Sequence, residues 1–121
     1  MKDETRRWVE LADADLAAAK VLLKEGILAL SVFHCQQAIE KLLKAIWIET
    51  RGEPSPRTHN LVDLAREMAL PLGEWEQFLG RLSDQAVASR YAGAEGYSQA
   101  DAQEYHRRTL ELCARLRQHL K

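Results

Sequence analysis

The sequence has few of the features that mark cross-linked, membrane-spanning or broadly cationic proteins. Its 121 residues include two cysteines and three prolines, and no run approaches the roughly 18 apolar residues that a membrane-spanning helix needs. Cys35 and Cys113 both fall within apolar helical patterns, which predicts buried free thiols rather than a disulfide framework. The formal net charge is −1, so no overall basic field would recruit nucleic acid. The first residues, MKDETRRW, lack the apolar segment of a secretory leader, and we expect a cytoplasmic protein with no membrane partner.

Signatures of catalysis and of metal or cofactor binding are missing as well. The sequence has no Gly-rich phosphate loop, no HExxH motif and no CxxC pair. Its four histidines, at 34, 59, 106 and 119, lie in separate segments without metal-ligand spacing. The chain therefore predicts no metal site, no cofactor and no recognisable catalytic centre.

Helical periodicity runs through almost the whole chain. It predicts one domain over residues 1–121, an all-α antiparallel up-and-down bundle of about five helices, with no strand candidate. Gly26 should end the first helix, Pro54 and Pro56 mark an exposed loop, and Ser98 should cap the last helix. The expected helices cover residues 5–25, 31–50, 61–70, 74–88 and 99–120.

The helix expected over residues 31–50 organises the others, because it carries a broad apolar stripe. The stripe consists of Val32, Cys35, Ile39, Leu42 and Ile46.

A polar strip lies beside this stripe. Gln37, Glu40, Lys41 and Lys44 are spaced i, i+3, i+4 and i+7, so they share one face of the helix. A solvated outer face would explain the strip, and so would a polar groove. Asp15 interrupts the apolar face of the first helix, where it either reaches water at the edge or anchors a basic or amide partner on another helix.

Two further places carry chemically useful side chains. The segment before the last helix contains Arg90, Tyr91 and Tyr97 around glycines 93 and 96, and it could pack as a plain helix connection or close over a ligand. His59 follows the proline-containing loop, where a capping role and a ligand contact are both open.

Three pieces of sequence occur together in one order: CQQAIEKLLKA at 35–45, Thr58-His59-Asn60-Leu61, and Ser89-Arg90-Tyr91. This combination resembles the HEPN domain family (higher eukaryotes and prokaryotes nucleotide-binding), in its small stand-alone prokaryotic form, over the whole chain. The resemblance implies a helical bundle that forms a homodimer. It also implies a partner, a minimal nucleotidyltransferase, with which such proteins form a two-component or toxin–antitoxin pair.

Many HEPN proteins are metal-independent ribonucleases with an Arg followed, after four to six residues, by a His. The next histidine after Arg90 is His106, which is too far along the chain for this signature. The departure favours a non-catalytic binding role, although the fold could still bring His106 to Arg90. A ribonuclease toxin and a purely structural helical adaptor are the alternatives.

The resemblance and the polar strip together define a candidate nucleotide- or RNA-binding groove. In it, Lys41, Lys44 and Arg90 would contact phosphate, and a tyrosine would stack on the base. The same side chains could instead form a satisfied network at a dimer seam, and Trp47 and Trp75 could add apolar surface there. The full candidate set is Gln37, Glu40, Lys41, Lys44, His59, Arg90, Tyr91 and Tyr97.

Overall fold

Five α-helices and a terminal 3₁₀ turn form the part of the chain that the computed structural model describes, which is residues 1–58, 60–91 and 97–120, with residues 85–91 described by their backbone. No strand occurs among these residues, so the predicted all-α fold is confirmed. The elements are α1 (Asp3–Lys24), α2 (Leu28–Arg51), α3 (Leu61–Glu67), α4 (Trp75–Tyr91), α5 (Gln99–Arg117) and η1 (Gln118–Leu120).

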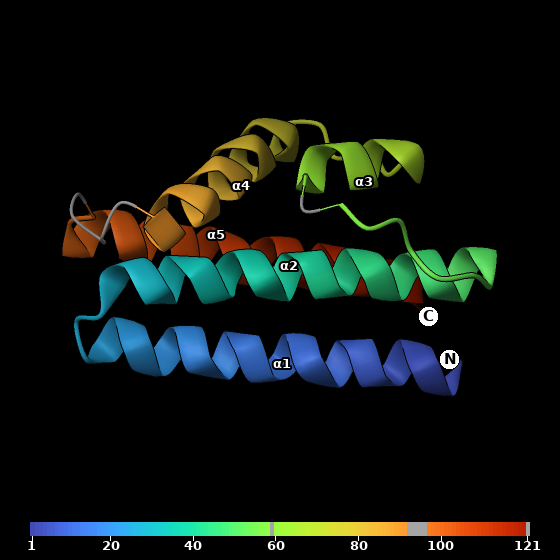
Figure 1. The fold of residues 1–121 in the computed structure, drawn as a ribbon, viewed down its shortest axis with the longest axis horizontal. Helices are drawn as coiled ribbons and strands as arrows, with labels where there is room; N and C mark the ends of the chain where they lie inside the picture. Colours follow the sequence, from blue (N-terminus) through green and yellow to red (C-terminus); the bar gives the residue numbers. More distant parts are fainter. Residues whose placement is uncertain (59, 92–96, 121) are drawn as a thin grey trace.

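The helix α2 is the centre of the bundle. It contacts every other element, while α1 and α5 run alongside it and the shorter α3 and α4 lie across one side (Figure 1). Its predicted apolar stripe is confirmed, because each of the five side chains is at most 1% exposed. Both ends of the described chain lie at the same end of the bundle (Figure 1). None of the described helices combines the length and apolarity needed to cross a membrane.

The turn between α1 and α2 closes as the glycine at its centre predicts. Gly26 has φ +76°, and the N–H groups of Gly26 and Ile27 donate to the carbonyls of Leu23 and Leu22 at 3.1 and 2.9 Å. This pair of bonds is the Schellman motif, which satisfies two carbonyls at a helix end and needs a left-handed residue. The short turn makes α1 and α2 antiparallel neighbours (Figure 1).

The end of α3 has the same hydrogen-bond pattern with a different residue in the left-handed position. Ala69 has φ +53°, and the N–H groups of Ala69 and Leu70 donate to the carbonyls of Arg66 and Ala65 at 2.9 and 3.2 Å. An alanine Cβ makes this conformation about 1 kcal/mol costlier than it is for glycine. No glycine marks this helix end in the sequence, which is why the predicted helix runs three residues further than α3 does.

The start of α1 has neither Asp3 nor Thr5 as its cap residue. Lys2 occupies the cap position without a side-chain capping bond, and Thr5 is completely buried. Glu49 of α2 supplies the acceptor instead: it receives the backbone N–H of Lys2 at 2.9 Å and the Thr5 hydroxyl at 3.0 Å. A residue of the neighbouring helix thus satisfies donors at the first turn of α1.

The predicted cap of α5 is confirmed, and α3 also begins with a side-chain cap. Asn60 accepts the N–H of Asp63 at the start of α3, and Ser98 forms a reciprocal capping box with Asp101 at the start of α5. The prediction that Arg90 and Tyr91 lie in a loop is wrong, because α4 continues through Tyr91. No glycine or proline occurs between Gly80 and Gly93, so nothing stops the helix earlier.

Burial settles two further points. Leu11, which the helical pattern places on the inward face of α1, is 43% exposed. Trp47 and Trp75, which could have added apolar surface at a dimer seam, are 5% and 6% exposed and pack into the core. Both cysteines are buried and free, as predicted.

Candidate binding site between α1 and α2

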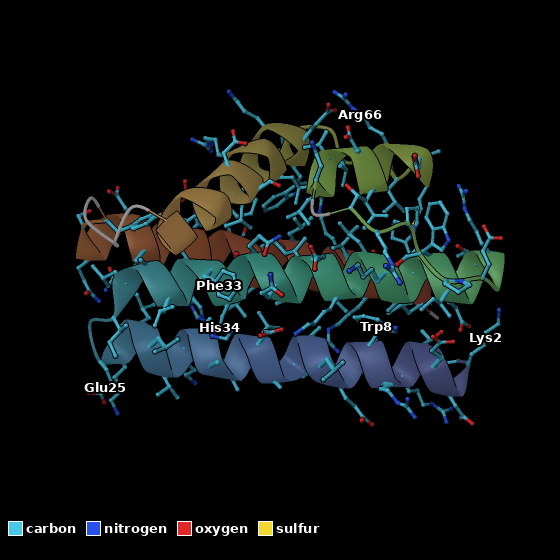
Figure 2. All side chains as sticks on the ribbon, in the orientation of Figure 1. Lys2, Trp8, Glu25, Phe33, His34 and Arg66 are labelled. Carbon is cyan, nitrogen blue, oxygen red and sulfur yellow. The ribbon has the colours of Figure 1, made fainter. Side chains whose placement is uncertain are left out.

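Asp15 links α1 to α2 through both of its carboxylate oxygens. The Lys41 ammonium donates to Oδ2, and the Nδ1 atom of His34 lies 2.8 Å from Oδ1. Asp15 is 7% exposed, so its charge is held in a largely dry position by two partners on the facing helix. Of the two interpretations of Asp15, the structure supports the anchor on another helix. Figure 2 labels His34 and Trp8 along the line where the two helices meet.

One turn beyond Lys41, Lys44 forms a second polar contact. Its ammonium lies 3.5 Å from Oε2 of Glu40, the i, i+4 pair expected from the sequence, and 5.5 Å from the ring centre of Trp8 on α1. Glu40 is 4% exposed, whereas the Lys44 side chain keeps 15% exposure. Lys44 is thus fixed over an aromatic face and still reaches solvent.

Gln37 completes the strip. Its amide nitrogen donates to Oε1 of the buried Gln36 at 2.7 Å. All four residues of the strip therefore have partners within the chain, and Lys41 is engaged by Asp15. The polar strip is a paired network along the α1–α2 contact rather than a solvated outer face.

The network opens into a groove at the end where α1 begins. The groove has a volume of about 260 Å³, and Trp8 and Lys44 face the proline-containing segment that follows α2 across it. It combines an aromatic ring, an apolar wall and the cationic groups of Lys44 and Arg57, with Glu4 at its rim. The lining residues are Glu4, Trp8, Lys44, Ile48, Pro54, Ser55, Pro56 and Arg57.

Trp8 and Arg57 were not among the predicted site residues. The sequence did contain a signal for Trp8, because it precedes Asp15 by seven residues and therefore lies two turns away on the same face of α1. The approach of Arg57 depends on how the chain folds back after Gly52, where φ is +68°. No periodicity reports that path.

One aromatic candidate, Tyr97, lies elsewhere. Tyr97 packs edge-on against Tyr105 of α5, with ring centres 6.2 Å apart, and Tyr105 in turn contacts Phe78 of α4. Tyr97 therefore belongs to the α4–α5 side of the bundle rather than to the Lys41–Asp15 contact. His59 and the side chains of Arg90 and Tyr91 lie outside the described residues, so their membership of the site stays a prediction.

His106 lies on α5 and is half-buried. Burial, together with the nearby ammonium of Lys20 on α1, lowers its pKa below the ordinary value of 6.5. Its relation to Arg90, whose side chain is outside the described part of the chain, stays open. A lowered pKa favours the neutral imidazole at physiological pH.

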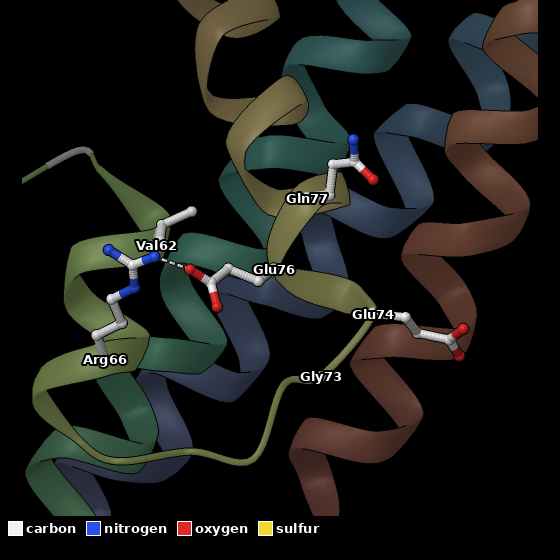
Figure 3. Close-up of a pocket in the computed structure, with 6 residues that line it drawn as sticks. All are labelled: Val62, Arg66, Gly73, Glu74, Glu76 and Gln77. Carbon is white, nitrogen blue, oxygen red and sulfur yellow. Dashed lines mark hydrogen bonds and ion pairs between the residues drawn. The ribbon is translucent and has the colours of Figure 1, made fainter.

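A larger hollow, about 560 Å³, lies between α3 and α4 (Figure 3). Arg66 and Glu76 form an ion pair across it, and Gln77 and Glu74 extend from the start of α4. The cation that lines this hollow, Arg66, is therefore already paired. Among the described residues, no group of three or more His, Cys, Asp or Glu side chains could hold a metal ion.

The family model for the HEPN domain matches residues 5–119, so the chain belongs to the HEPN domain family. Two solved structures share its fold over nearly the full length of both chains. One is TT1696 from Thermus thermophilus, with 23% identity, a TM-score of 0.84, and coverage of 98% of this chain and 99% of that one. The other is ST0689, an archaeal HEPN homologue, with 26% identity, a TM-score of 0.80 and complete coverage of both. None of the curated proteins compared with the chain matches it.

Proposed function

We propose that this HEPN-domain protein is a non-catalytic nucleotide-binding homodimer that works with a minimal nucleotidyltransferase in a two-component, toxin–antitoxin-like system. One observation carries the binding proposal: Trp8, Lys44 and Arg57 surround the groove at the start of α1. An aromatic face beside two cations offers the two contacts that a nucleotide needs, stacking for the base and charge for the phosphate.

The paired network gives each strip residue a separate part in this proposal. Lys44 lies at the groove, where the buried carboxylate of Glu40 orients it and Trp8 supplies the stacking face. Lys41 is engaged by Asp15, so it fixes α1 against α2 rather than binding phosphate directly. Gln37 forms a hydrogen bond with the adjacent Gln36. His59 remains a candidate for a second wall.

Isothermal titration calorimetry with ATP, AMP and inorganic phosphate tests the groove. We expect Trp8→Leu and Lys44→Gln each to weaken nucleotide binding by about tenfold, because each removes a contact of about 1–2 kcal/mol. Lys24→Gln, an exposed change at the far end of α1, is the matched control and should bind as the parent does. Equal nucleotide affinity in all four proteins, or no binding to the parent, would reject the groove.

The homodimer proposal rests on uncovered apolar side chains. Leu11 and Val21 of α1 and Leu110 of α5 are 43%, 60% and 45% exposed. Exposed apolar side chains of this kind are the ones that a second copy would cover in a homodimer. Sedimentation velocity should give a dimer for the parent chain and a monomer for Val21→Glu combined with Leu110→Glu. A parent monomer at all accessible concentrations would reject the dimer.

The partner proposal is tested by co-expression with a minimal nucleotidyltransferase, followed by co-purification. A stable complex supports the pairing. A dimer that binds neither nucleotide nor transferase would instead be a structural adaptor. Cleavage of RNA by the purified chain, abolished in His106→Ala, would point to the ribonuclease alternative.

A further inference from the structure

Another hollow, distinct from the α1–α2 groove and from the hollow between α3 and α4, lies where the end of α2 and the η1 turn meet the chain that follows α3. It has a volume of about 370 Å³, within the range of small-molecule sites. None of its lining residues lines the α1–α2 groove. The lining consists of Ile46, Thr50, Arg51, Met68, Ala69, Leu70, Pro71 and His119.

The ionisable side chains that line this hollow are all basic. Arg51 and His119 are the ionisable groups among the described lining residues, and no carboxylate is among them. A smaller adjoining cavity of about 30 Å³ shares His119, Leu70 and Pro71 and adds Arg115. Three basic side chains therefore gather here in a chain whose net charge is −1.

Arg51 is held in position before any ligand arrives. Its guanidinium lies 4.1 Å from the ring centre of Trp47, and one terminal nitrogen donates to the carbonyl of Glu67 at 2.5 Å. A guanidinium has five N–H donors in a planar fork, and the carbonyl of Glu67 uses one of them. Because the ring contact and this hydrogen bond already hold the guanidinium, less side-chain entropy remains to be lost on binding an oxyanion.

We propose that this hollow binds a small molecule with an oxyanion head, a phosphomonoester or a carboxylate, on a short apolar stem. The head would lie between Arg51 and His119, with Arg115 adding charge from the adjoining cavity. The stem would pack on the apolar part of the wall, formed by Ile46, Met68, Leu70 and Pro71. This inference is independent of the proposed function, since the two sites have no residue in common.

Amide NMR titrations of the full chain with butyl phosphate, butyrate and inorganic phosphate test it, with butylamine as the cationic control. We expect saturable shifts at Thr50, Ala69 and His119 with butyl phosphate or butyrate, and none with butylamine. Butyl phosphate binding more tightly than butyrate would identify a phosphomonoester as the head, and the reverse order a carboxylate. Inorganic phosphate, which lacks the stem, should bind several-fold more weakly than butyl phosphate.

The variants separate binding from structural support. Arg51→Gln should weaken binding at least about fivefold, and His119→Gln should weaken it to a smaller extent. Arg51→Lys is the second variant, for use if Arg51→Gln proves poorly folded. It keeps the positive charge and loses the planar fork of donors, so it should bind more weakly than the parent chain. Lys24→Gln should bind as the parent does. Unchanged affinity in folded Arg51→Gln and His119→Gln would overturn the proposal and leave Arg51 with the sole role of neutralising helix ends. Shifts confined to Trp8 and Lys44 would overturn it too.

Discussion

Asp15 of α1 and Lys41 of α2 form an ion pair across the main helix–helix contact, with His34 on the second carboxylate oxygen. The two side chains are 9% and 22% exposed, so removing one partner leaves the other charged and poorly hydrated. Fully buried pairs lose about 3–5 kcal/mol when one partner is removed. The Asp15–Lys41 pair is partly exposed to solvent. The loss of stability on removing one partner should therefore lie below that range.

We predict that Lys41→Met lowers the free energy of unfolding by about 2 kcal/mol, because the buried Asp15 loses one of its two partners. Adding Asp15→Asn should restore part of that loss, since the uncompensated charge is then removed. Urea unfolding of the four proteins of this double-mutant cycle measures the coupling. Arg6→Met, which breaks an exposed pair with Asp3 at 3.8 Å, is the control and should change stability by less than about 0.5 kcal/mol. Additive single changes at Asp15 and Lys41 would contradict the prediction.

The sequence predicted the helices, the apolar stripe of α2 and the polar strip beside it, because periodicity reports which residues share a face. It left the partner of Asp15 open, since a spacing within α1 does not reveal what faces it from α2. The groove around Trp8 and Arg57 was missed for a related reason. It depends on where the chain after Gly52 returns, and that path follows from tertiary packing.

The two Schellman turns predict stability changes of opposite sign for two single substitutions. Gly26→Ala should lower stability by about 1 kcal/mol, because a Cβ is strained at φ +76°. Ala69→Gly should raise stability by a similar amount, because glycine removes that strain at φ +53°. Thermal unfolding of both variants against the parent measures the shifts. No heavy atom lies within 4 Å of a Cβ built on Gly26, so a large loss there would indicate a cause other than the backbone conformation.

His106 should make stability depend on pH just below neutrality. Burial and Lys20 lower its pKa in the folded chain below 6.5, so the unfolded chain binds the proton more readily. The stability that this effect contributes is present above pH 6.5 and is lost as the pH falls through the folded pKa. His106→Gln should flatten the stability profile in that window, as measured by urea unfolding between about pH 5 and 7. A profile equally steep in the variant would assign the pH dependence to other groups.

Glu49 should make stability depend on pH in a separate, more acidic range. The backbone N–H of Lys2 and the Thr5 hydroxyl lower its pKa below the ordinary 4.5. Its contribution to stability is therefore present above pH 4.5 and is lost as the pH falls through the folded pKa. Glu49→Gln should weaken the start of α1 at neutral pH and reduce the loss of stability on acidification below pH 4.5. Amide hydrogen exchange in the first turns of α1 would locate the effect.

The two cysteines should be inert until the bundle opens. Burial raises the pKa of Cys35 to about 11 and that of Cys113 to about 12, where the neighbouring Cys35 adds to the effect. At about pH 8 the reactive thiolate of Cys35 is then on the order of one molecule in a thousand, compared with roughly a quarter for an unfolded thiol of pKa about 8.5. Iodoacetamide followed by mass spectrometry should find both thiols unmodified in the native chain and both modified in urea. Rapid native labelling of Cys35 alone would show that the α2–α5 contact opens locally, because Cys35 packs beside Thr109 at that contact.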